Sequence, residues 1–450
     1  MQNSMPETLR FKTDIAFRKL TLVKLLHVIT MHEKDIVTAL YNDFKKPAFE
    51  AVITETAYVI ADLKSTIRNL KSWTSRKRVR PSLFNFPSSD FIYHEPYGKV
   101  LIIAPWNYPF HLAITPLIAA VAAGNQVVLK PSELAPNTAS IIELIICEAF
   151  DPMHVEVYQG GAEVSEKLLL RRWDYIFFTG SVAVGKIVAM AAAANLTPVT
   201  LELGGKNPCI VDETANLKLA AKRIVWGKFI NAGQTCIAPD YIMVKHNVKQ
   251  KLIGLLQKEI TIAYGDDPFI SPDFPRIINV KNHRRLAGMI DKAKVAAGGI
   301  VNESDLYIAP TLIDEPAPES ALMGEEIFGP ILPVIGYNSD EELNVRISRY
   351  EKPLAFFVFT ENSDFAEKLI RDFSFGGGCI NDTIVHSLNK RLPFGGVGHS
   401  GIGAYHGQFG FDTFSHKKSI VRKGTWLDIP IRYAPYGNKL EHIKKILKWF

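Results

Sequence analysis

Three short segments of the chain carry side chains that could take part in chemistry. Asn107 lies in the sequence PWNYP, and its amide could donate to an oxyanion or only satisfy the backbone of a turn. Cys236 follows Gly-Gln-Thr at the end of a predicted helix, where its thiol could act as a nucleophile, although a lone cysteine is more often a small buried hydrophobic residue. In the sequence KPSE, Lys130 and Glu133 could bind sugar hydroxyls or pair with each other at the surface.

A glycine-bearing turn follows the fourth predicted strand. Gly180 and Ser181 end this strand in the sequence FTGS, and Gly185 lies where the next helix begins. Glycine allows close backbone approach, and a helix N-terminus presents free N–H groups to a phosphate. The stretch nearly matches a P-loop, but Ile187 replaces the Ser or Thr that would hold Mg²⁺. The turn therefore predicts a phosphate contact, and an ATP-dependent enzyme is disfavoured.

An alternation of apolar strands and helices must position these residues. Strands are predicted at 100–104, 127–130, 155–158, 175–178 and 198–201, with helices between them at 111–123, 137–149, 164–170 and 182–195. This order predicts βαβ units around a buried parallel sheet, in which ligands bind at the carboxyl ends of the strands.

Further elements are predicted on both sides of this sheet. Amphipathic helices are expected at 14–44 and 48–73, and residues 76–89 are expected to form a solvated linker. A second α/β block is expected from 207 to about 383, with helices at 217–231, 248–263 and 283–297 and strands at 241–245, 331–335 and 355–359. The glycine-rich segment 392–407 is expected to be an ordered loop.

Composition and charge exclude several classes of protein. The 450 residues are 47% hydrophobic and 22% charged, which suits two or three globular domains and excludes a disordered or fibrous chain. Four scattered cysteines without a C-x-x-C pair predict neither a disulfide framework nor a metal site. We expect a cytoplasmic protein, because no secretory signal is apparent. The net charge of +6 is concentrated in residues 416–450, so the nearly neutral remainder predicts no nucleic-acid partner.

Six motifs together resemble one enzyme family. PWNYP, KPSE, FTGS, ELGGK, GQTC and EEIFGP occur in the order and at the spacing of the NAD(P)-dependent aldehyde dehydrogenase superfamily. The sequences NDT at 381–383, PFGGVGHSGIGAYHG and FDTFSH are similar to class 3, the fatty and aromatic aldehyde dehydrogenase type. One departure is Phe409-Gly410-Phe411, where a serine usually precedes the last phenylalanine.

The resemblance implies an α/β architecture of three parts. A Rossmann-like parallel-sheet cofactor domain would comprise residues 1–82 and 99–204, and an α/β catalytic domain residues 205–410. A small β arm at 83–98 and 411–435 would bridge a homodimer. Residues 436–450 are expected to form a C-terminal amphipathic helix, from the pattern discussed below.

The resemblance also implies a mechanism and a cofactor. Cys236 would attack an aldehyde, the amide of Asn107 would hold the oxyanion, and Glu202 would activate the water that hydrolyses a thioester. The cofactor would be NAD, with NADP as a second candidate, and the substrate an apolar medium- or long-chain or aromatic aldehyde. The residues implied to bind the cofactor are Lys130, Glu133, Gly180, Ser181, Gly185, Leu203, Glu326 and Phe328. The alternative is a non-catalytic binding relative, which the intact catalytic set disfavours.

The basic tail has three interpretations. Apolar residues recur there at helical spacing between lysines; they are Leu440, Ile443, Ile446, Leu447 and Phe450. Such a face suits a helix that lies on a membrane surface, a lid over the substrate funnel, or a helix packed on the body of the protein. The segment is too short to span a bilayer, so any membrane contact that it makes is expected to be peripheral.

Overall fold

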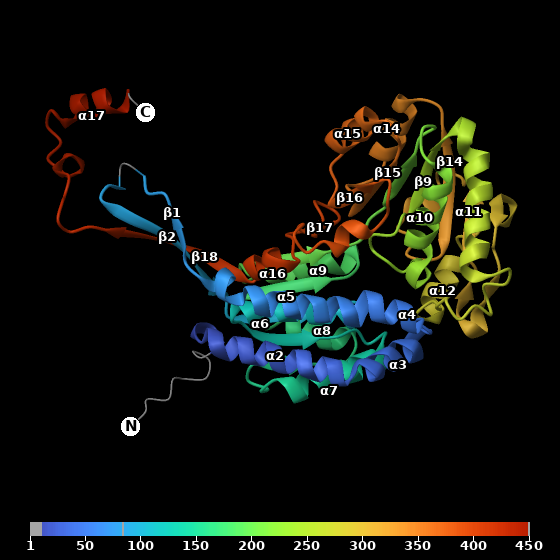
Figure 1. The fold of residues 1–450 in the computed structure, drawn as a ribbon, viewed down its shortest axis with the longest axis horizontal. Coiled ribbons are helices and arrows are strands. Elements are labelled where there is room, and N and C mark those ends of the chain that lie inside the picture. Colours follow the sequence, from blue (N-terminus) through green and yellow to red (C-terminus); the bar gives the residue numbers. More distant parts are fainter. Residues whose placement is uncertain (1–10, 83–84, 449–450) are drawn as a thin grey trace. The chain divides into compact units, whose positions relative to one another are not determined.

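The computed structural model describes residues 11–82 and 85–448, which fall into two compact units (Figure 1). The larger unit contains the described residues up to Trp73 together with Glu95–His416. The smaller unit contains Thr74–His94 and the described residues from Lys417 onward. All residues of the candidate site lie in the larger unit, so we describe the two units separately.

The first sheet of the larger unit is the predicted parallel sheet. Its strands, in the order β17-β7-β6-β3-β4-β5, are β17 (Gly401–Ile402), β7 (Val199–Glu202), β6 (Tyr175–Thr179), β3 (Lys99–Ile103), β4 (Gln126–Lys130) and β5 (Val155–Val157). Neighbouring strands are parallel except β17, which pairs antiparallel with β7 inside the predicted loop 392–407. The connecting helices are α6 (His111–Ala123), α7 (Pro136–Ala149), α8 (Ala162–Leu169) and α9 (Val182–Ala193). The prediction of βαβ units is therefore confirmed.

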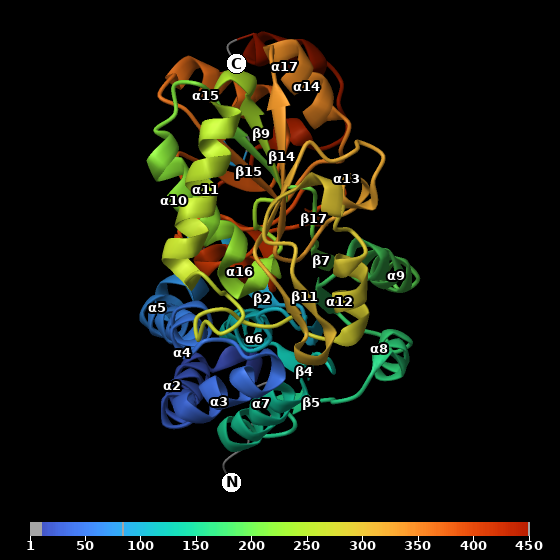
Figure 2. The same cartoon turned by 90° about the vertical axis from the view of Figure 1, so that its right-hand side faces the viewer.

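Helices cover both faces of this sheet. Because side chains alternate along a strand, Val100 and Ile102 of β3 join one hydrophobic cluster, and Leu101 and Ile103 join another. The first cluster includes residues of α6, α7 and the N-terminal helices, and the second includes residues of α8 and α9. Figure 2 shows α8 and α9 on the side away from α2 and α3. A sheet buried on both faces explains why its strands are continuous apolar runs.

The N-terminal segment forms helices with two interruptions. They are α2 (Ile15–Met31), α3 (Glu33–Phe44), α4 (Ala48–Ala51), the π-helical turn η1 (Val52–Thr56) and α5 (Ala57–Thr74). The single helix predicted at 14–44 is thus wrong at His32, whose ψ of 14° lies outside the helical range. His32 instead bonds Asp35 in the first turn of α3, at 2.8 Å. The π turn lies directly beside the site described below.

The second sheet has seven strands. Their order is β10-β13-β14-β9-β8-β15-β16, formed by β10 (Val295–Ala297), β13 (Thr311–Asp314), β14 (Ile331–Tyr337), β9 (Tyr241–Lys245), β8 (Pro208–Val211), β15 (Ala355–Phe359) and β16 (Gly377–Ile380). The helices α10 (Leu217–Phe229) and α11 (Lys249–Tyr264) pack on one face, and α14 (Asp340–Ser348) and α15 (Ser363–Asp372) on the other. The helix predicted at 283–297 is wrong in its second half. Only α12 (Val280–Ala287) is α-helical there, because Val295–Ala297 pair with β13 instead.

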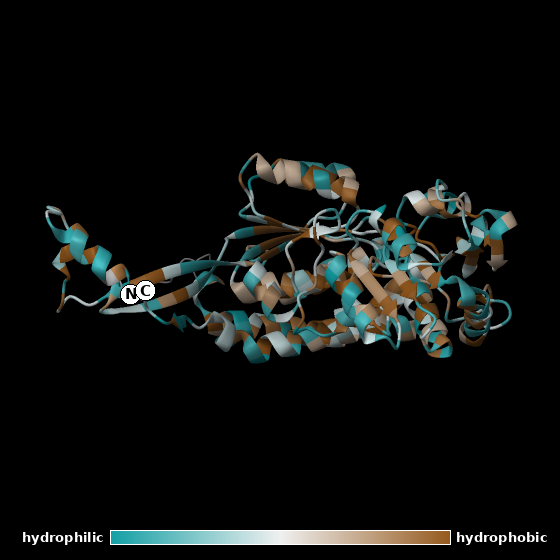
Figure 3. Ribbon diagram, turned by 90° about the horizontal axis from the view of Figure 1, so that it is seen from above, coloured by the Kyte–Doolittle hydropathy of each residue, from teal (hydrophilic) through white to brown (hydrophobic). Residues whose placement is uncertain are grey.

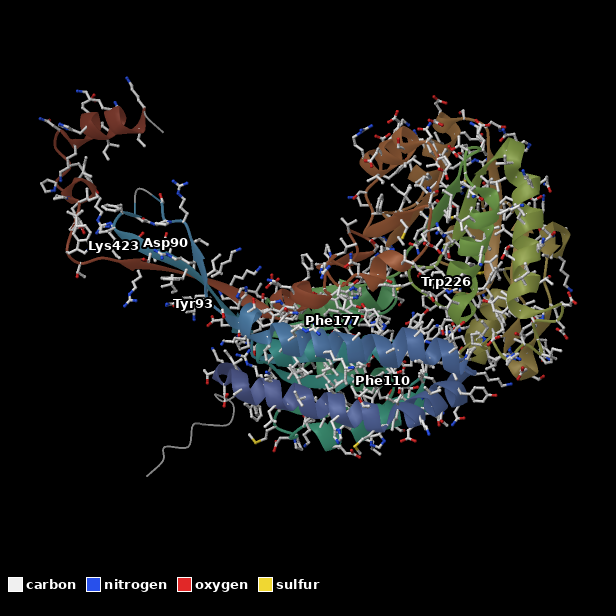
Figure 4. All side chains as sticks on the ribbon, viewed as in Figure 1. Asp90, Tyr93, Phe110, Phe177, Trp226 and Lys423 are labelled. Atoms are coloured by element: carbon white, nitrogen blue, oxygen red, sulfur yellow. The ribbon has the colours of Figure 1, made fainter. Side chains whose placement is uncertain are left out.

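The smaller unit is built on a strongly basic β-ribbon. Strands β1 (Lys77–Val79), β2 (Ser88–Pro96) and β18 (Ser415–Lys423) form a sheet in the order β1-β2-β18, and Figure 4 labels Asp90 and Tyr93 on β2. The linker predicted at 76–89 is therefore wrong for β1, which pairs with β2 through its backbone and needs no apolar periodicity. Figure 3 shows hydrophilic and hydrophobic residues following one another along these strands. Residues 74–94 and 417–450 together carry 13 Lys and Arg against 3 Asp and Glu.

The predicted C-terminal helix is present as α17 (Lys439–Leu447). Its residues Leu440 and Leu447 are exposed, as are the lysines between them. Phe450, which the sequence pattern assigned to the same face, lies outside the described residues. No helix in the described ranges is long and apolar enough to cross a membrane.

Candidate active site

A mostly apolar cavity of about 200 Å³ lies in the larger unit. Two of the predicted catalytic residues, Cys236 and Glu202, line it together with Tyr108, the neighbour of Asn107. Figure 4 labels Trp226, which lines the cavity from α10. The remaining lining residues are Ile53, Thr54, Tyr58, His111, Leu112, Thr179, Leu203, Ile230, Thr235, Ile237, Leu354, Ile384, Ser387, Leu388, Phe394, Tyr405 and His406. Motifs more than a hundred residues apart thus meet around one cavity.

A strained loop presents Cys236 to this cavity. After α10 ends, Asn231 and Ala232 both adopt left-handed backbone angles, with φ of 55° and 52°. Non-glycine residues in this conformation cost free energy and persist only where the surroundings impose it. Gly233 also has a positive φ of 73°, and a Cβ there would lie 2.3 Å from the carbonyl oxygen of Gly329. The glycine of the GQTC motif is therefore required by both the backbone turn and the lack of space.

Two buried amide side chains hold the loop in place. Gln234 donates to the carbonyl oxygens of Asn231 and Arg276 at 3.1 and 3.0 Å and accepts the N–H of Ile278 at 3.0 Å. Asn207 donates to the carbonyl oxygens of Cys236 and Ala238 at 2.8 and 3.0 Å. Neither residue was predicted to act at the site, although Gln234 lies within the GQTC motif and Asn207 directly follows ELGGK. Their hydrogen bonds fix the carbonyl groups on both sides of the cysteine.

Carboxylates surround the Cys236 thiol. Burial, followed by the charges of Glu326 and Glu202, raises the pKa of Cys236 to about 12. Burial also raises the pKa of Glu202 well above its ordinary value. Neither carboxylate oxygen of Glu202 has a hydrogen-bond partner among the described residues. Burial thus disfavours the ionised form of both groups, and Glu202 lies on the same cavity wall as the thiol.

Asn107 lies beside the cysteine loop. Its carbonyl oxygen accepts a hydrogen bond of 2.9 Å from the amide of Asn231, which also donates to the carbonyl of Gln234 at 3.1 Å. Asn107 is buried as a whole residue, at 3% exposed, but it does not line the cavity. The next residue, Tyr108, bonds through its hydroxyl group to the hydroxyl of Thr235 at 2.7 Å. The segment that carries Asn107 is thus held next to the thiol loop.

Six of the predicted cofactor residues lie at or after the carboxyl ends of first-sheet strands, while Glu326 and Phe328 precede β14 of the second sheet. Lys130 ends β4, and its ammonium group donates to Glu133 at 2.6 Å. Since β4 is three strands from β7, Lys130 lies about 14 Å from the end of β7, at ~4.8 Å per strand. Strand β6 lies between β7 and β4 in the sheet. Gly180 and Ser181 follow β6, and Ser181 is the N-cap of α9. The row therefore suits an elongated ligand that lies across the strand ends.

Two close approaches shape this row near Glu202. A Cβ at Gly185 would lie 2.6 Å from a methyl carbon of Leu203, so a side chain there would crowd the first turn of α9. A Cβ at Gly204 would lie 2.0 Å from a carboxylate oxygen of Glu326, which fills the space above this glycine. Burial and the neighbouring Asp240 raise the pKa of Glu326 to about 8.

The segment after Glu326 is held by other parts of the second block. Phe328 has a φ of 52°, and its ring meets the edge of Trp106 at a centroid distance of 5.3 Å. Arg285 donates to the carbonyl of Ile327 at 2.6 Å. The residues present fit a dinucleotide: a lysine and a carboxylate at one end, the serine-capped N-terminus of α9 in the middle, and the Glu326 carboxylate with the nearby Phe328 ring at the other end.

Comparisons with known proteins agree with this geometry. Residues 9–420 match the model of the aldehyde dehydrogenase family. The chain is 49% identical to 4,4'-diaponeurosporen-aldehyde dehydrogenase of Staphylococcus aureus (strain NCTC 8325 / PS 47), over 97% of this chain and 95% of that protein. It is 44% identical to the dimeric NADP-preferring aldehyde dehydrogenase of Rattus norvegicus, over 91% and 90% of the two chains.

Solved structures extend the comparison to the fold. The substrate-bound state of Staphylococcus aureus AldH superposes with a TM-score of 0.96 at 48% identity, covering 98% of this chain and 96% of that chain. An indole-3-acetaldehyde dehydrogenase in complex with NAD+ superposes with a TM-score of 0.83 at 25% identity, covering 92% and 85%. The motifs, the cavity and these matches lead to one conclusion: the chain belongs to the aldehyde dehydrogenase family.

Proposed function

We propose that this chain oxidises an apolar aldehyde to the carboxylic acid with NAD+ or NADP+, using Cys236 as nucleophile and Glu202 as general base. The observation that carries this proposal is the placement of both side chains on one cavity, with neither Glu202 oxygen bonded to any residue that the structure describes. A non-catalytic binding protein would have no need for a buried carboxylate without a hydrogen bond, which costs free energy.

The side chains divide the chemistry between them. A thiol whose pKa is raised to about 12 needs a proton acceptor. Because the pKa of Glu202 is also raised, the difference between the pKa values of the two groups is smaller, which favours proton transfer from the thiol to the carboxylate. The thiolate attacks the carbonyl carbon, and the Asn107 amide with the backbone N–H of Cys236 holds the resulting oxyanion. When bound, an oxidised nicotinamide would supply the hydride acceptor that the thiohemiacetal on Cys236 needs to become a thioester. Glu202, having passed the thiol proton to solvent, then takes a proton from water, whose oxygen attacks the thioester carbon. The carbon–sulfur bond breaks, the acid is released, and Glu202 returns the proton to the Cys236 thiolate.

The cofactor would lie along the row of strand ends. Lys130 and Glu133 would contact the adenosine ribose, and the first turn of α9 the pyrophosphate. Leu203 and Phe328 would pack beside the nicotinamide, and Glu326 would bond its ribose. The residues assigned to the pyrophosphate are Gly180, Ser181 and Gly185. Because the Glu133 carboxylate is 42% exposed and would repel a 2′-phosphate, NAD is the expected cofactor and NADP the weaker one.

The cavity favours an apolar substrate. Apart from Glu202 and the thiol, its walls are mainly aliphatic and aromatic, and its imidazole groups are neutral. Burial lowers the pKa of His406 to about 3, and that of His111 well below its ordinary value. The Staphylococcus aureus relative is named for a 4,4'-diaponeurosporen-aldehyde. A medium- or long-chain or aromatic aldehyde therefore suits this site better than a charged one.

The assembly and location of the enzyme follow the same family pattern. We propose a homodimer bridged by the β arm at 83–98 and 411–435, with a cofactor domain at 1–82 and 99–204 and a catalytic domain at 205–410. The name of the rat relative, which describes it as dimeric, supports this assembly. We place the enzyme in the cytoplasm with α17 on a membrane surface, because this helix exposes leucines between lysines. Removal of residues 439–450 should then weaken binding to anionic liposomes, and unchanged binding would contradict the membrane contact.

The proposed reaction can be tested by following cofactor reduction at 340 nm. Purified protein is given NAD+ or NADP+ and straight-chain aldehydes from acetaldehyde to hexadecanal, without coenzyme A. We expect turnover that improves with chain length and is abolished by Cys236→Ala. Cys147→Ala is the matched control, because Cys147 is an exposed free thiol on α7. Cofactor binding without turnover of any aldehyde would favour the non-catalytic relative.

A further inference from the structure

A buried ion pair lies behind the wall of the active-site cavity. The ammonium group of Lys46 donates to a carboxylate oxygen of Glu55 at 2.8 Å, and both side chains are 0% exposed. Lys46 lies between α3 and α4, and Glu55 lies in the π turn η1. Neither residue lines the cavity, although Ile53 and Thr54 of the same π turn do. The mechanism proposed above does not use this pair.

The second oxygen of Glu55 holds the start of α6. It accepts the backbone N–H groups of Phe110 and His111 at 3.1 and 2.8 Å. The helix has no side-chain cap at its own N-cap residue, so Glu55 takes that role from a distant segment. The PWNYP segment with Asn107 ends at the residue before Phe110. The position of the Asn107 loop therefore depends on the Glu55 carboxylate.

Lys46 holds the same loop from another direction. Its ammonium group lies 4.0 Å from the centroid of the Tyr108 ring, a cation–π contact. The hydroxyl of Tyr108 bonds Thr235 at 2.7 Å, and Thr235 immediately precedes Cys236. A continuous chain of contacts therefore runs from Lys46 through Tyr108 to the nucleophile loop.

A neighbouring carboxylate reaches the nucleophile loop directly. Glu50 of α4 accepts the backbone N–H of Asn231 at 2.9 Å, at the first left-handed residue of that loop. The side chain of Asn231 in turn donates to the carbonyl of Asn107 at 2.9 Å. The short segment 46–55 thus contacts both loops whose relative position decides how the amide of Asn107 meets the oxyanion.

Stability does not explain an ion pair in this place. Desolvation of two charges often costs as much as their attraction returns, so a well-packed apolar pair would serve the fold equally well. A π turn within a helix is also unfavourable locally and is frequently found at functional sites. The buried ion pair and the π turn are both explained if segment 46–55 has to hold charged groups at fixed positions behind the Asn107 loop and the Cys236 loop.

We propose that Lys46 and Glu55 are positioning residues, which set the geometry of the oxyanion-binding amide of Asn107 relative to the Cys236 thiol. This inference rests on the proposed roles of Asn107 and Cys236. The pair acts through the Asn107 loop and makes no contact with substrate or cofactor.

The test compares Lys46→Met and Glu55→Gln with a matched buried lysine. Lys249→Met removes an ammonium group that is 6% exposed, against 0% for Lys46, and that is bonded to the partly exposed Asp314 and Glu315 at 2.9 and 2.7 Å, remote from the cavity. The measurements are thermal unfolding, cofactor dissociation constants, and the pre-steady-state burst of reduced cofactor at 25 °C. We expect both site variants to slow the burst and lower kcat/KM by 10- to 100-fold, with cofactor affinity within twofold of wild type. Lys249→Met should lower the Tm comparably and keep its burst rate.

Two further variants keep the inference falsifiable if Lys46→Met fails to fold. Tyr108→Phe removes only the hydroxyl bond to Thr235 and should slow the burst three- to tenfold. In an Asn107→Ala background, Glu55→Gln should cause little additional loss, because both changes disturb the same group. A normal burst in Tyr108→Phe, or in a folded Glu55→Gln, would overturn the inference. If Asn107→Ala is slow in the same experiments, the proposed function is nevertheless supported. A fully active Asn107→Ala enzyme would instead contradict the proposed function, and the inference with it.

Discussion

Replacement of Glu202 by glutamine separates the chemistry of this residue from its effect on the fold. The variant keeps the shape of the side chain and removes its ability to accept a proton. Neither carboxylate oxygen has a hydrogen-bond partner among the described residues, so the substitution breaks no internal hydrogen bond. Burial raises the pKa of Glu202 above its unfolded value, so the ionised group destabilises the fold as the pH rises above that value. Glu202→Gln should therefore be at least as stable as wild type at pH 7.

The expected loss lies in thioester hydrolysis. Positioned general bases contribute 10²- to 10⁴-fold, which corresponds to about 3–5 kcal/mol of transition-state stabilisation. Because Glu202 also adjoins the protonated thiol, its removal should slow acylation as well, by a smaller factor. The steady-state rate should then fall by at least 100-fold, while one equivalent of reduced cofactor still forms in the first turnover.

Rapid mixing and mass spectrometry test both parts of this prediction. The variant is mixed with saturating NAD+ and an aliphatic aldehyde, and absorbance at 340 nm is followed through the first turnover. Intact-protein mass after quenching should show an acyl group, and peptide mapping should place it on Cys236. A steady-state rate within threefold of wild type, or no acyl-enzyme at a reduced rate, would refute the assignment of Glu202 as the hydrolytic base.

Three other substitutions test separate features of the site. Glu326→Gln should stabilise the cofactor-free protein relative to wild type, increasingly between pH 5 and 8, by roughly 1 kcal/mol per pH unit. The reason is that the folded-state pKa of Glu326, about 8, lies above the ordinary value. Urea unfolding at each pH measures the difference in stability, and a pH-independent difference would contradict the prediction. Gly204→Ala should raise the KM for the cofactor at least tenfold, because its Cβ would displace the Glu326 carboxylate. Its control is Gly254→Ala in α11, where a Cβ meets nothing within 4 Å and should stabilise the helix by up to ~1 kcal/mol without a kinetic effect. Glu133→Gln should improve kcat/KM for NADP+ relative to NAD+ by about three- to tenfold, since it removes a carboxylate that would face the 2′-phosphate; an unchanged ratio would place Glu133 away from the ribose.

Apolar runs made the longer strands predictable from the sequence. Strands β9 and β15 begin and end where they were predicted, because each is a mainly apolar, largely buried run rich in β-branched or aromatic residues. Strand β16, of sequence GGCI, was missed because two of its four residues have no side chain. Its glycines are nevertheless explained by the structure, since a Cβ at Gly378 would lie 2.1 Å from the carbonyl oxygen of Phe356 on β15. Backbone proximity of this kind leaves no hydrophobic pattern to detect.

The motifs identified the reacting groups but not the contacts that hold them. Asn107 and Cys236 were named from local sequence and Glu202 from the family resemblance, and the structure brings Cys236 and Glu202 to one cavity. The partners of these groups are far away in the chain: Tyr108 is 127 residues from Thr235, and Glu55 is 56 residues from His111. No local periodicity encodes such pairs. These contacts can be identified only from the three-dimensional structure.

The geometry of the nucleophile loop is therefore a property of the whole larger unit and not of the GQTC motif alone. Asn231 and Ala232 are held in a conformation that costs of order 1–3 kcal/mol each, and the motif by itself contains nothing that would impose it. The restraints come from the N-terminal helices through Glu50, from the Asn107 loop, and from the second sheet through Asn207. Since these restraints enter from separate parts of the sequence, loss of one should leave the fold intact and still displace the thiol. Substitutions far from the motif, in a segment that never touches substrate, are thus expected to change the reaction rate before they change the stability.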